Sequence, residues 1–245
     1  MLVLIALSLL AATPQTVERW RSFEIALRGP ATGNPFVDVQ VSATFTLAND
    51  HHVPTVLTVG GFYDDGGAYK VRFAPPLEGI WTYTTSSNAR ALNGHTGSLL
   101  AVKPSPTNHG PVLSHGFELR HADGTPHVSV GSTSYQWASM PKAMQAQTLQ
   151  TLRHGQGDGR IFSKQRMTVF PKWYRNNHQN PVEVGAAFEI RPGSAAANAS
   201  VWGCVGSKCP SVTGSFDLTR FNVSFWRNYE GLVAQMQEAG VVAVR

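Results

Sequence analysis

Aromatic and cationic side chains gather where two predicted strands end. Five residues share this placement: Tyr135, Trp137, Lys172, Trp173 and Tyr174. Aromatic rings with polar tips suit the C–H face of a sugar ring. A lysine ammonium donates hydrogen bonds to hydroxyls and attracts acidic sugars. These residues predict a carbohydrate-binding surface, while packing of the same rings inside the protein is an equally open interpretation.

Arg166 precedes Met167 within the second of these strands. Because side chains alternate along a strand, one of the two faces the interior of the predicted barrel and the other faces the helices. An arginine in the interior requires a carboxylate partner. Arg166 is therefore a further candidate for substrate binding.

Hydrolysis of a bound sugar ordinarily requires two carboxyl groups, about 5 Å apart for retention or about 6.5–9.5 Å apart for inversion. Most of the 15 Asp and Glu residues fall in predicted turns, helices and the N-terminal half of the chain. Glu183 and Glu189 follow the second strand, but a long loop holds such groups poorly. No residue of this sequence is therefore assigned as a catalytic acid.

The sequence predicts neither a metal nor a cofactor. Four histidines are spaced by six residues in a predicted linker and hairpin, without accompanying acidic residues: His109, His115, His121 and His127. Such positions do not converge as metal ligands must. The pair Asp64 and Asp65 precedes two glycines, which favours a tight turn over a calcium loop.

Cys204 and Cys209 lack the C-x-x-C spacing of a zinc site, so we predict a small disulfide loop in an oxidising compartment. Asn198 and Asn222 each begin an N-x-S sequon, a glycosylation acceptor in a secreted eukaryotic protein. Residues 1–12 are apolar and end in small residues, which favours a signal peptide over residues 1–16 and a secreted protein. A buried first strand is the alternative for this segment.

Composition excludes several classes of protein. The net charge is +5 and the pI is 9.4, but the Lys and Arg residues are scattered, so no nucleic-acid surface is expected. No other stretch is apolar enough for a membrane anchor. With 42% hydrophobic residues, the chain can bury a core.

Short alternating strands separated by turns fill residues 17–105 and predict an antiparallel, Ig-like β-sandwich. After a Pro-rich linker, strands at 128–135, 167–170 and 241–245 alternate with helices at 142–154 and about 219–239. This order is typical of a parallel sheet. Since three strands cannot close an eight-stranded barrel, we expect residues 106–245 to be the first part of a (β/α)8 barrel; a small open α/β sheet is the alternative.

An ordered series of motifs resembles glycoside hydrolases in which a sandwich domain precedes an apiosidase-like (β/α)8 domain. The motifs are Trp20 through Leu27, residues 29–39, 61–76 and 78–83, Asn108-His-Gly-Pro111, residues 122–126, Gly131-Ser-Thr-Ser-Tyr-Gln-Trp137 and residues 164–174. Gln165 departs from the pattern, since that family usually has an apolar residue there.

This resemblance implies a secreted hydrolase of O-glycosyl bonds acting on oligo- or polysaccharide, with its catalytic carboxylates expected beyond Arg245. The alternative is a non-catalytic carbohydrate- or protein-binding β-sandwich module. Binding of glycans to residues 17–105 alone would favour this second interpretation.

Overall fold

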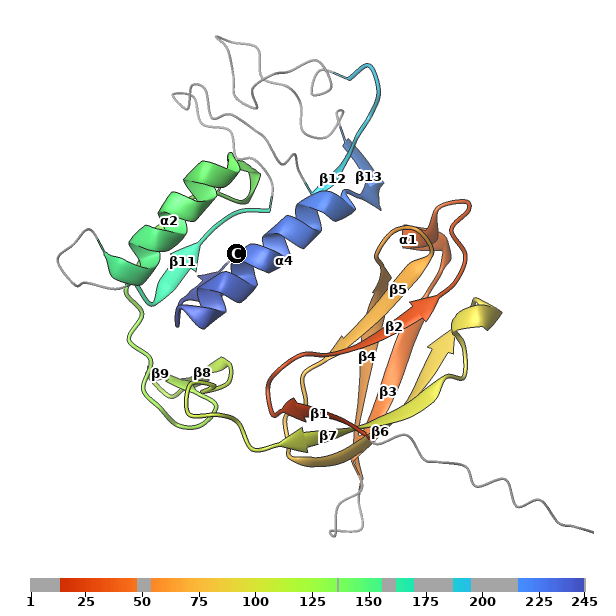
Figure 1. Ribbon diagram of the computed structural model, residues 1–245, viewed down its shortest axis with the longest axis horizontal. Helices are drawn as coiled ribbons and strands as arrows, with labels where there is room; N and C mark the ends of the chain where they lie inside the picture. Colours follow the sequence, from red (N-terminus) through yellow and green to blue (C-terminus); the bar gives the residue numbers. More distant parts are fainter. Residues whose placement is uncertain are drawn as a thin grey trace, which may run out of the picture. The chain divides into compact units, whose positions relative to one another are not determined.

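The protein is described by a computed structural model that covers residues 14–47, 54–135, 137–155, 162–169, 187–194 and 216–244 (Figure 1). The chain divides into two compact units. Unit 1 holds the chain up to Ala31 and residues Val39–Gly110, and unit 2 holds Thr32–Asp38 and Pro111–Arg245.

Unit 1 is a single hydrogen-bonded sheet of seven strands in the order β1-β7-β6-β3-β4-β5-β2. Its strands are β1 (Gln15–Glu18), β2 (Phe23–Arg28), β3 (Val41–Leu47), β4 (Thr55–Tyr63), β5 (Ala68–Phe73), β6 (Gly79–Ser87) and β7 (Thr96–Val102). All pairs are antiparallel except β1 with β7, which is parallel.

Strand β4 joins the two halves of this sheet. Its residues from Thr55 to Gly60 pair with β3, whereas Gly61 to Tyr63 pair with β5. A Cβ atom at Gly61 would lie 2.7 Å from the carbonyl oxygen of Lys70, so only glycine permits this close approach. The sheet therefore continues through β4 instead of dividing into the two separate sheets predicted for an Ig-like sandwich.

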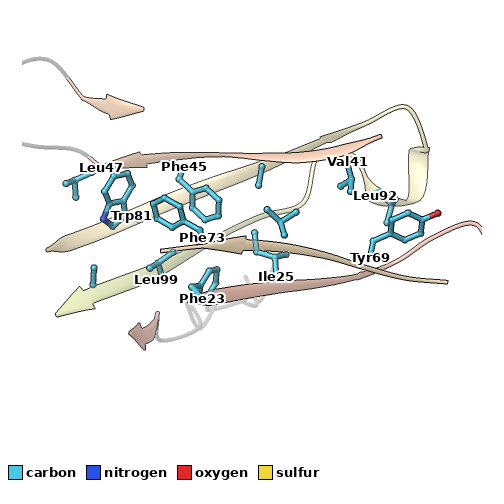
Figure 2. Packing of buried hydrophobic residues seen from close by; sticks show 13 residues of the cluster. Phe23, Ile25, Val41, Phe45, Leu47, Tyr69, Phe73, Trp81, Leu92 and Leu99 are labelled. Atoms are coloured by element: carbon cyan, nitrogen blue, oxygen red, sulfur yellow. The ribbon is translucent and has the colours of Figure 1, made fainter. Parts of the chain in front are cut away.

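The core of unit 1 lies between the two halves of the sheet, and Figure 2 shows its side chains. Phe45 is fully buried and stacks on Phe73, with the ring centroids 3.9 Å apart. Trp81 is also fully buried, and its indole N–H donates to the carbonyl oxygen of Leu77 at 3.0 Å. The alternating apolar residues of the sequence thus form one aromatic core, as their period of two requires.

Unit 2 contains a parallel sheet of three described strands in the order β10-β11-β14. These strands are β10 (Gly131–Thr133), β11 (Lys164–Arg166) and β14 (Val242–Val244). Helix α2 (Lys142–His154) lies between β10 and β11 in sequence, and helix α4 (Val223–Glu238) precedes β14. The unit also holds α1 (Pro35–Asp38) and the hairpins β8 (Val112–His115) with β9 (Glu118–His121) and β12 (Phe188–Ile190) with β13 (Phe216–Phe221).

Both long helices bury one face against the parallel sheet. Leu149 of α2 and Met236 of α4 share a core with Met167, which follows β11. Helix α4 begins after Asn222, whose Oδ1 accepts from the Phe225 N–H at 3.2 Å. Within the described residues, no helix is long and apolar enough to cross a bilayer.

The predicted fold class, an Ig-like sandwich followed by an incomplete (β/α)8 barrel, is wrong. Strands dominate the described residues, and α-helix there is confined to α1, α2 and α4. The described part of unit 2 forms an open three-stranded sheet with two added hairpins, and no barrel is formed. The alternation of strand and helix predicted the parallel pairing, but it does not specify how many strands join one sheet.

Several boundaries also differ from the sequence prediction. Within the region predicted to be strands, α1 occupies Pro35–Asp38, so β3 begins only at Val41. The last helix was predicted from about residue 219, but Phe216–Phe221 form β13, so α4 begins at Val223 with Asn222 as its cap. Helix α2 and its end at Gly155 were predicted correctly.

Candidate functional site

The carboxyl ends of β10 and β11 are held together by backbone hydrogen bonds that continue past the strands. The Ser134 N–H donates to the Arg166 carbonyl at 2.9 Å, and the Thr168 N–H donates to the Tyr135 carbonyl at 3.0 Å. The Thr168 hydroxyl donates to the same Tyr135 carbonyl. The residue after β10 and the residues after β11 are therefore fixed relative to each other.

At this end of the sheet a cation lies over an aromatic ring. The guanidinium carbon of Arg166 is 5.7 Å from the centre of the Tyr135 ring, within range of a cation–π interaction. Tyr135 is half-buried and Arg166 is exposed. The pair thus presents a ring, a phenol hydroxyl and the five N–H donors of a guanidinium at one place.

Of the two faces that the sequence left open for Arg166 and Met167, Arg166 lies on the one away from the helices and Met167 packs against them. The registers place Thr133, Arg166 and Val244 opposite one another, and all three are exposed on the same face of the sheet. The opposite face of β11 carries Gln165, and Met167 comes directly after the strand. Both side chains are fully buried on the side of the helices. The Arg166 charge is therefore solvated, and it needs no buried carboxylate.

For Trp137 the structure favours internal packing, the second of the two roles that the sequence left open. It is only 2% exposed, lies in the core with the helices, and donates its indole N–H to the Gln145 carbonyl at 3.2 Å. A ring with both faces packed cannot accept a sugar. Of the predicted binding residues, the structure therefore brings Tyr135 and Arg166 together and assigns Trp137 to packing.

The other predicted residues fall largely outside the described part of the chain. These are Lys172, Trp173, Tyr174, Glu183, Asn198, Cys204 and Cys209, with residues 1–12 of the signal segment. Asn222 is described and half-buried, and its Oδ1 accepts from both the Phe225 N–H and the Ser224 hydroxyl. Asn222 therefore has a structural role as a helix cap, whatever its sequon implies.

One pair of carboxylates lies face to face in unit 2. Glu189 of β12 is the register partner of Asp217 of β13. Hydrogen bonds from the Thr219 hydroxyl and N–H, at 2.7 and 3.0 Å, hold the pKa of Asp217 below its ordinary value. The lowered pKa favours the ionised form of Asp217, and the Thr219 hydrogen bonds fix its carboxylate, while Glu189 is exposed.

The spaced histidines yield one close pair. The rings of His121 and His127 lie 5.2 Å apart and nearly perpendicular, and burial lowers the pKa of His127. No group of three or more potential metal ligands occurs among the described residues.

The predicted turn at Asp64 and Asp65 is confirmed, because the Asp64 N–H donates to the Ala68 carbonyl at 2.8 Å and closes the turn.

Two comparisons give this chain relatives. A family model described as a domain of unknown function, DUF5060, matches residues 16–88, which fall mainly in unit 1. The chain also resembles the crystal structure of a putative glycoside hydrolase from Bacteroides vulgatus ATCC 8482, with 31% identity and a TM-score of 0.76. That match covers 94% of this chain and 40% of the other.

The chain therefore spans well under half the length of that solved protein. Over the matched length its fold is glycoside hydrolase-like, in agreement with the coarse prediction from the sequence motifs. A search of curated proteins found no match.

The sequence prediction missed Thr168, whose backbone and hydroxyl both fix the Tyr135 carbonyl. A hydroxyl residue two positions beyond a strand is a weak signal, since threonine is also a common strand residue. Only the register of β10 against β11 makes its role visible.

Proposed function

We propose that this chain takes part in the hydrolysis of O-glycosyl bonds, and that the carboxyl end of its parallel sheet binds the carbohydrate. The observation that carries the proposal is the placement of Tyr135, which follows β10, beside Arg166, the last residue of the adjacent β11. In α/β sheets, ligands bind outside the carboxyl ends of the strands, where loops and side chains converge. The glycoside hydrolase-like fold supports a sugar as that ligand.

The two side chains have complementary roles in this proposal. The exposed part of the Tyr135 ring offers a face to the C–H groups of a sugar. The Arg166 guanidinium donates to ring hydroxyls in a fixed planar geometry. Thr168 positions Tyr135 through its carbonyl, so it acts indirectly. We further propose that the protein is secreted, since polysaccharides are extracellular substrates and residues 1–12 have the composition of a signal peptide.

Calorimetric titration with neutral cello-, xylo- and galacto-oligosaccharides tests the binding step. We expect Tyr135→Phe to retain binding, because the ring remains, and Tyr135→Ala to lose about tenfold, because stacking on an aromatic ring is lost. Arg166→Gln should weaken binding by a similar factor. Lys164→Ala is the matched control, since Lys164 lies on the same strand at its amino end.

A reducing-end assay on the parent polysaccharides tests the hydrolytic part of the proposal. Release of new reducing ends supports a hydrolase, provided that the Tyr135→Ala variant releases them more slowly than the wild type. Equal affinity of wild type, Tyr135→Ala and Arg166→Gln for every sugar that binds would refute the proposed site.

A further inference from the structure

One outer face of unit 1 carries hydroxyl groups in a regular array. The register of β4, β3, β6 and β7 places nine hydroxyl side chains on the outer face of four adjacent strands, together with the exposed apolar side chains of Val56 and Ile80. They are Ser42, Thr44, Thr46, Thr58, Thr82, Thr84, Ser86, Thr96 and Ser98, which we term the hydroxyl face.

One row of this array crosses all four strands. Thr58 is opposite Thr44, Thr44 is opposite Thr84, and Thr84 is opposite Thr96. The hydroxyl oxygens of Thr44 and Thr58 are 3.0 Å apart and hydrogen-bonded. Neighbouring strands lie about 4.8 Å apart, so the hydroxyls repeat at short, fixed intervals across the sheet.

The face is also free of charge. Strands β3, β4, β6 and β7 contain no Asp, Glu, Lys or Arg. The charged strand residues of unit 1 lie on β1, β2 and β5, where Lys70 and Arg72 both pair with Glu24. Within these four strands, the outer face therefore carries no charged side chain, although the chain has a net charge of +5.

Threonine suits such a surface for reasons beyond its preference for strands. Its side chain has a branched, stiff χ1 torsion, so little rotamer entropy is lost when a ligand fixes it. Each threonine offers a hydroxyl that both donates and accepts, next to a methyl group. Among the described residues, the hydroxyls of Thr84, Thr96 and Ser98 make no hydrogen bond to protein, so they are available to a ligand.

We propose that the hydroxyl face is a docking surface for an extended, neutral polysaccharide. A neutral polymer matches the absence of charge, its hydroxyls match the array of donors and acceptors, and its C–H groups match the threonine methyls. The aromatic rings of the core cannot take this role, because Phe45, Phe73 and Trp81 are at most 3% exposed. The choice of a carbohydrate rests on the proposed function, whereas the face itself rests on strand register.

Depletion of the full chain by insoluble neutral polysaccharides, such as mannan, xylan and β-glucan, tests the proposal in low and high salt. We expect retention on at least one polymer, unchanged by salt, because no ion pair contributes. The variant Thr58→Val/Thr84→Val/Thr96→Val keeps the shape of the face and should lose about tenfold in affinity. The matched control Thr58→Ser/Thr84→Ser/Thr96→Ser keeps the hydroxyls and should stay within about threefold.

Three outcomes overturn the proposal: no retention on any neutral polymer, retention that high salt abolishes, or equal retention of the valine variant. Sedimentation velocity tests a fourth outcome. If the wild-type chain is a dimer and the valine variant is not, the hydroxyl face binds a second copy of this chain and not a polysaccharide. The chain could also bind short oligosaccharides through Tyr135 and yet not be retained on any polymer. That result would refute a docking role for the hydroxyl face, while the proposed function would still hold.

Discussion

Gln165 provides a sharp test of how unit 2 is packed. Its side chain is fully buried on the helix-covered face of the sheet, and its Oε1 has no hydrogen-bond partner among the residues that the structure describes. Its Nε2 reaches the Arg166 carbonyl at 3.5 Å, which is longer than an ordinary N–H···O bond. A buried acceptor without a partner costs about 1–3 kcal/mol.

Gln165→Met removes this unpaired oxygen and fills the same space with an apolar side chain. We expect the free energy of unfolding of unit 2 to rise by about 1–3 kcal/mol. For a chain of this size, each kcal/mol raises Tm by roughly 2–4 °C. The two units can unfold separately, so amide hydrogen exchange in β11 assigns the change to unit 2.

Gln150→Met is the matched control, because Gln150 is exposed on α2 and the same substitution there should change stability by less than about 0.5 kcal/mol. Gln165→Glu places a carboxyl group in the same buried position and should destabilise the unit. A loss of more than about 1 kcal/mol in Gln165→Met, with Gln150→Met neutral, would mean that Oε1 accepts a hydrogen bond. The argument from an unpaired oxygen would then be refuted.

Three further predictions concern the elements that support the two faces. Asn222→Ala should lower the urea midpoint of unit 2 by the equivalent of about 1 kcal/mol, while Asn222→Asp retains the cap; equal loss in both would contradict a capping role. Gly61→Ala should destabilise unit 1 by about 1–3 kcal/mol, whereas Gly60→Ala meets open space and should not; calorimetry separates them. Hydrogen bonding from Asn108 lowers the pKa of Glu18, so its contribution to stability is present above the ordinary carboxyl pKa and is lost as pH falls through the lowered value. Asn108→Ala should therefore raise the Glu18 pKa in an NMR titration, and an unchanged pKa would contradict that account.

Hydrophobic periodicity predicted the elements that bury one continuous face. Phe23 and Ile25 of β2 are buried as alternation requires, and α2 follows its apolar stripe and ends at a glycine. In β7 the consecutive apolar residues do not by themselves indicate the inward face, and the structure buries Leu99 and Ala101 while Leu100 and Val102 are half-buried. A run of consecutive apolar residues leaves the inward face undetermined until a neighbouring strand fixes the register.

Long-range pairing explains what the sequence could not predict. The continuity of unit 1 depends on Gly61 passing close to β5, and the β12–β13 hairpin joins segments about 25 residues apart. The candidate site has the same origin. Tyr135 and Arg166 were each identified from residue type and place, but their juxtaposition requires the parallel register of β10 with β11.

The hydroxyl face shows the complementary case. Each threonine alone is an ordinary strand residue. The hydroxyls form an ordered, uncharged array only because the four strands pair in this register. A charge-free array of this kind is invisible to motif searches, because its members are spread over residues 42–98.

The central claim is that the carboxyl end of the parallel sheet binds carbohydrate. Its most direct test follows the backbone amide resonances of the full chain during titration with the neutral oligosaccharide that binds best. We predict saturable shift changes centred on Tyr135, Arg166 and Thr168. Saturable binding whose shift changes leave these three residues unaffected would contradict the claim.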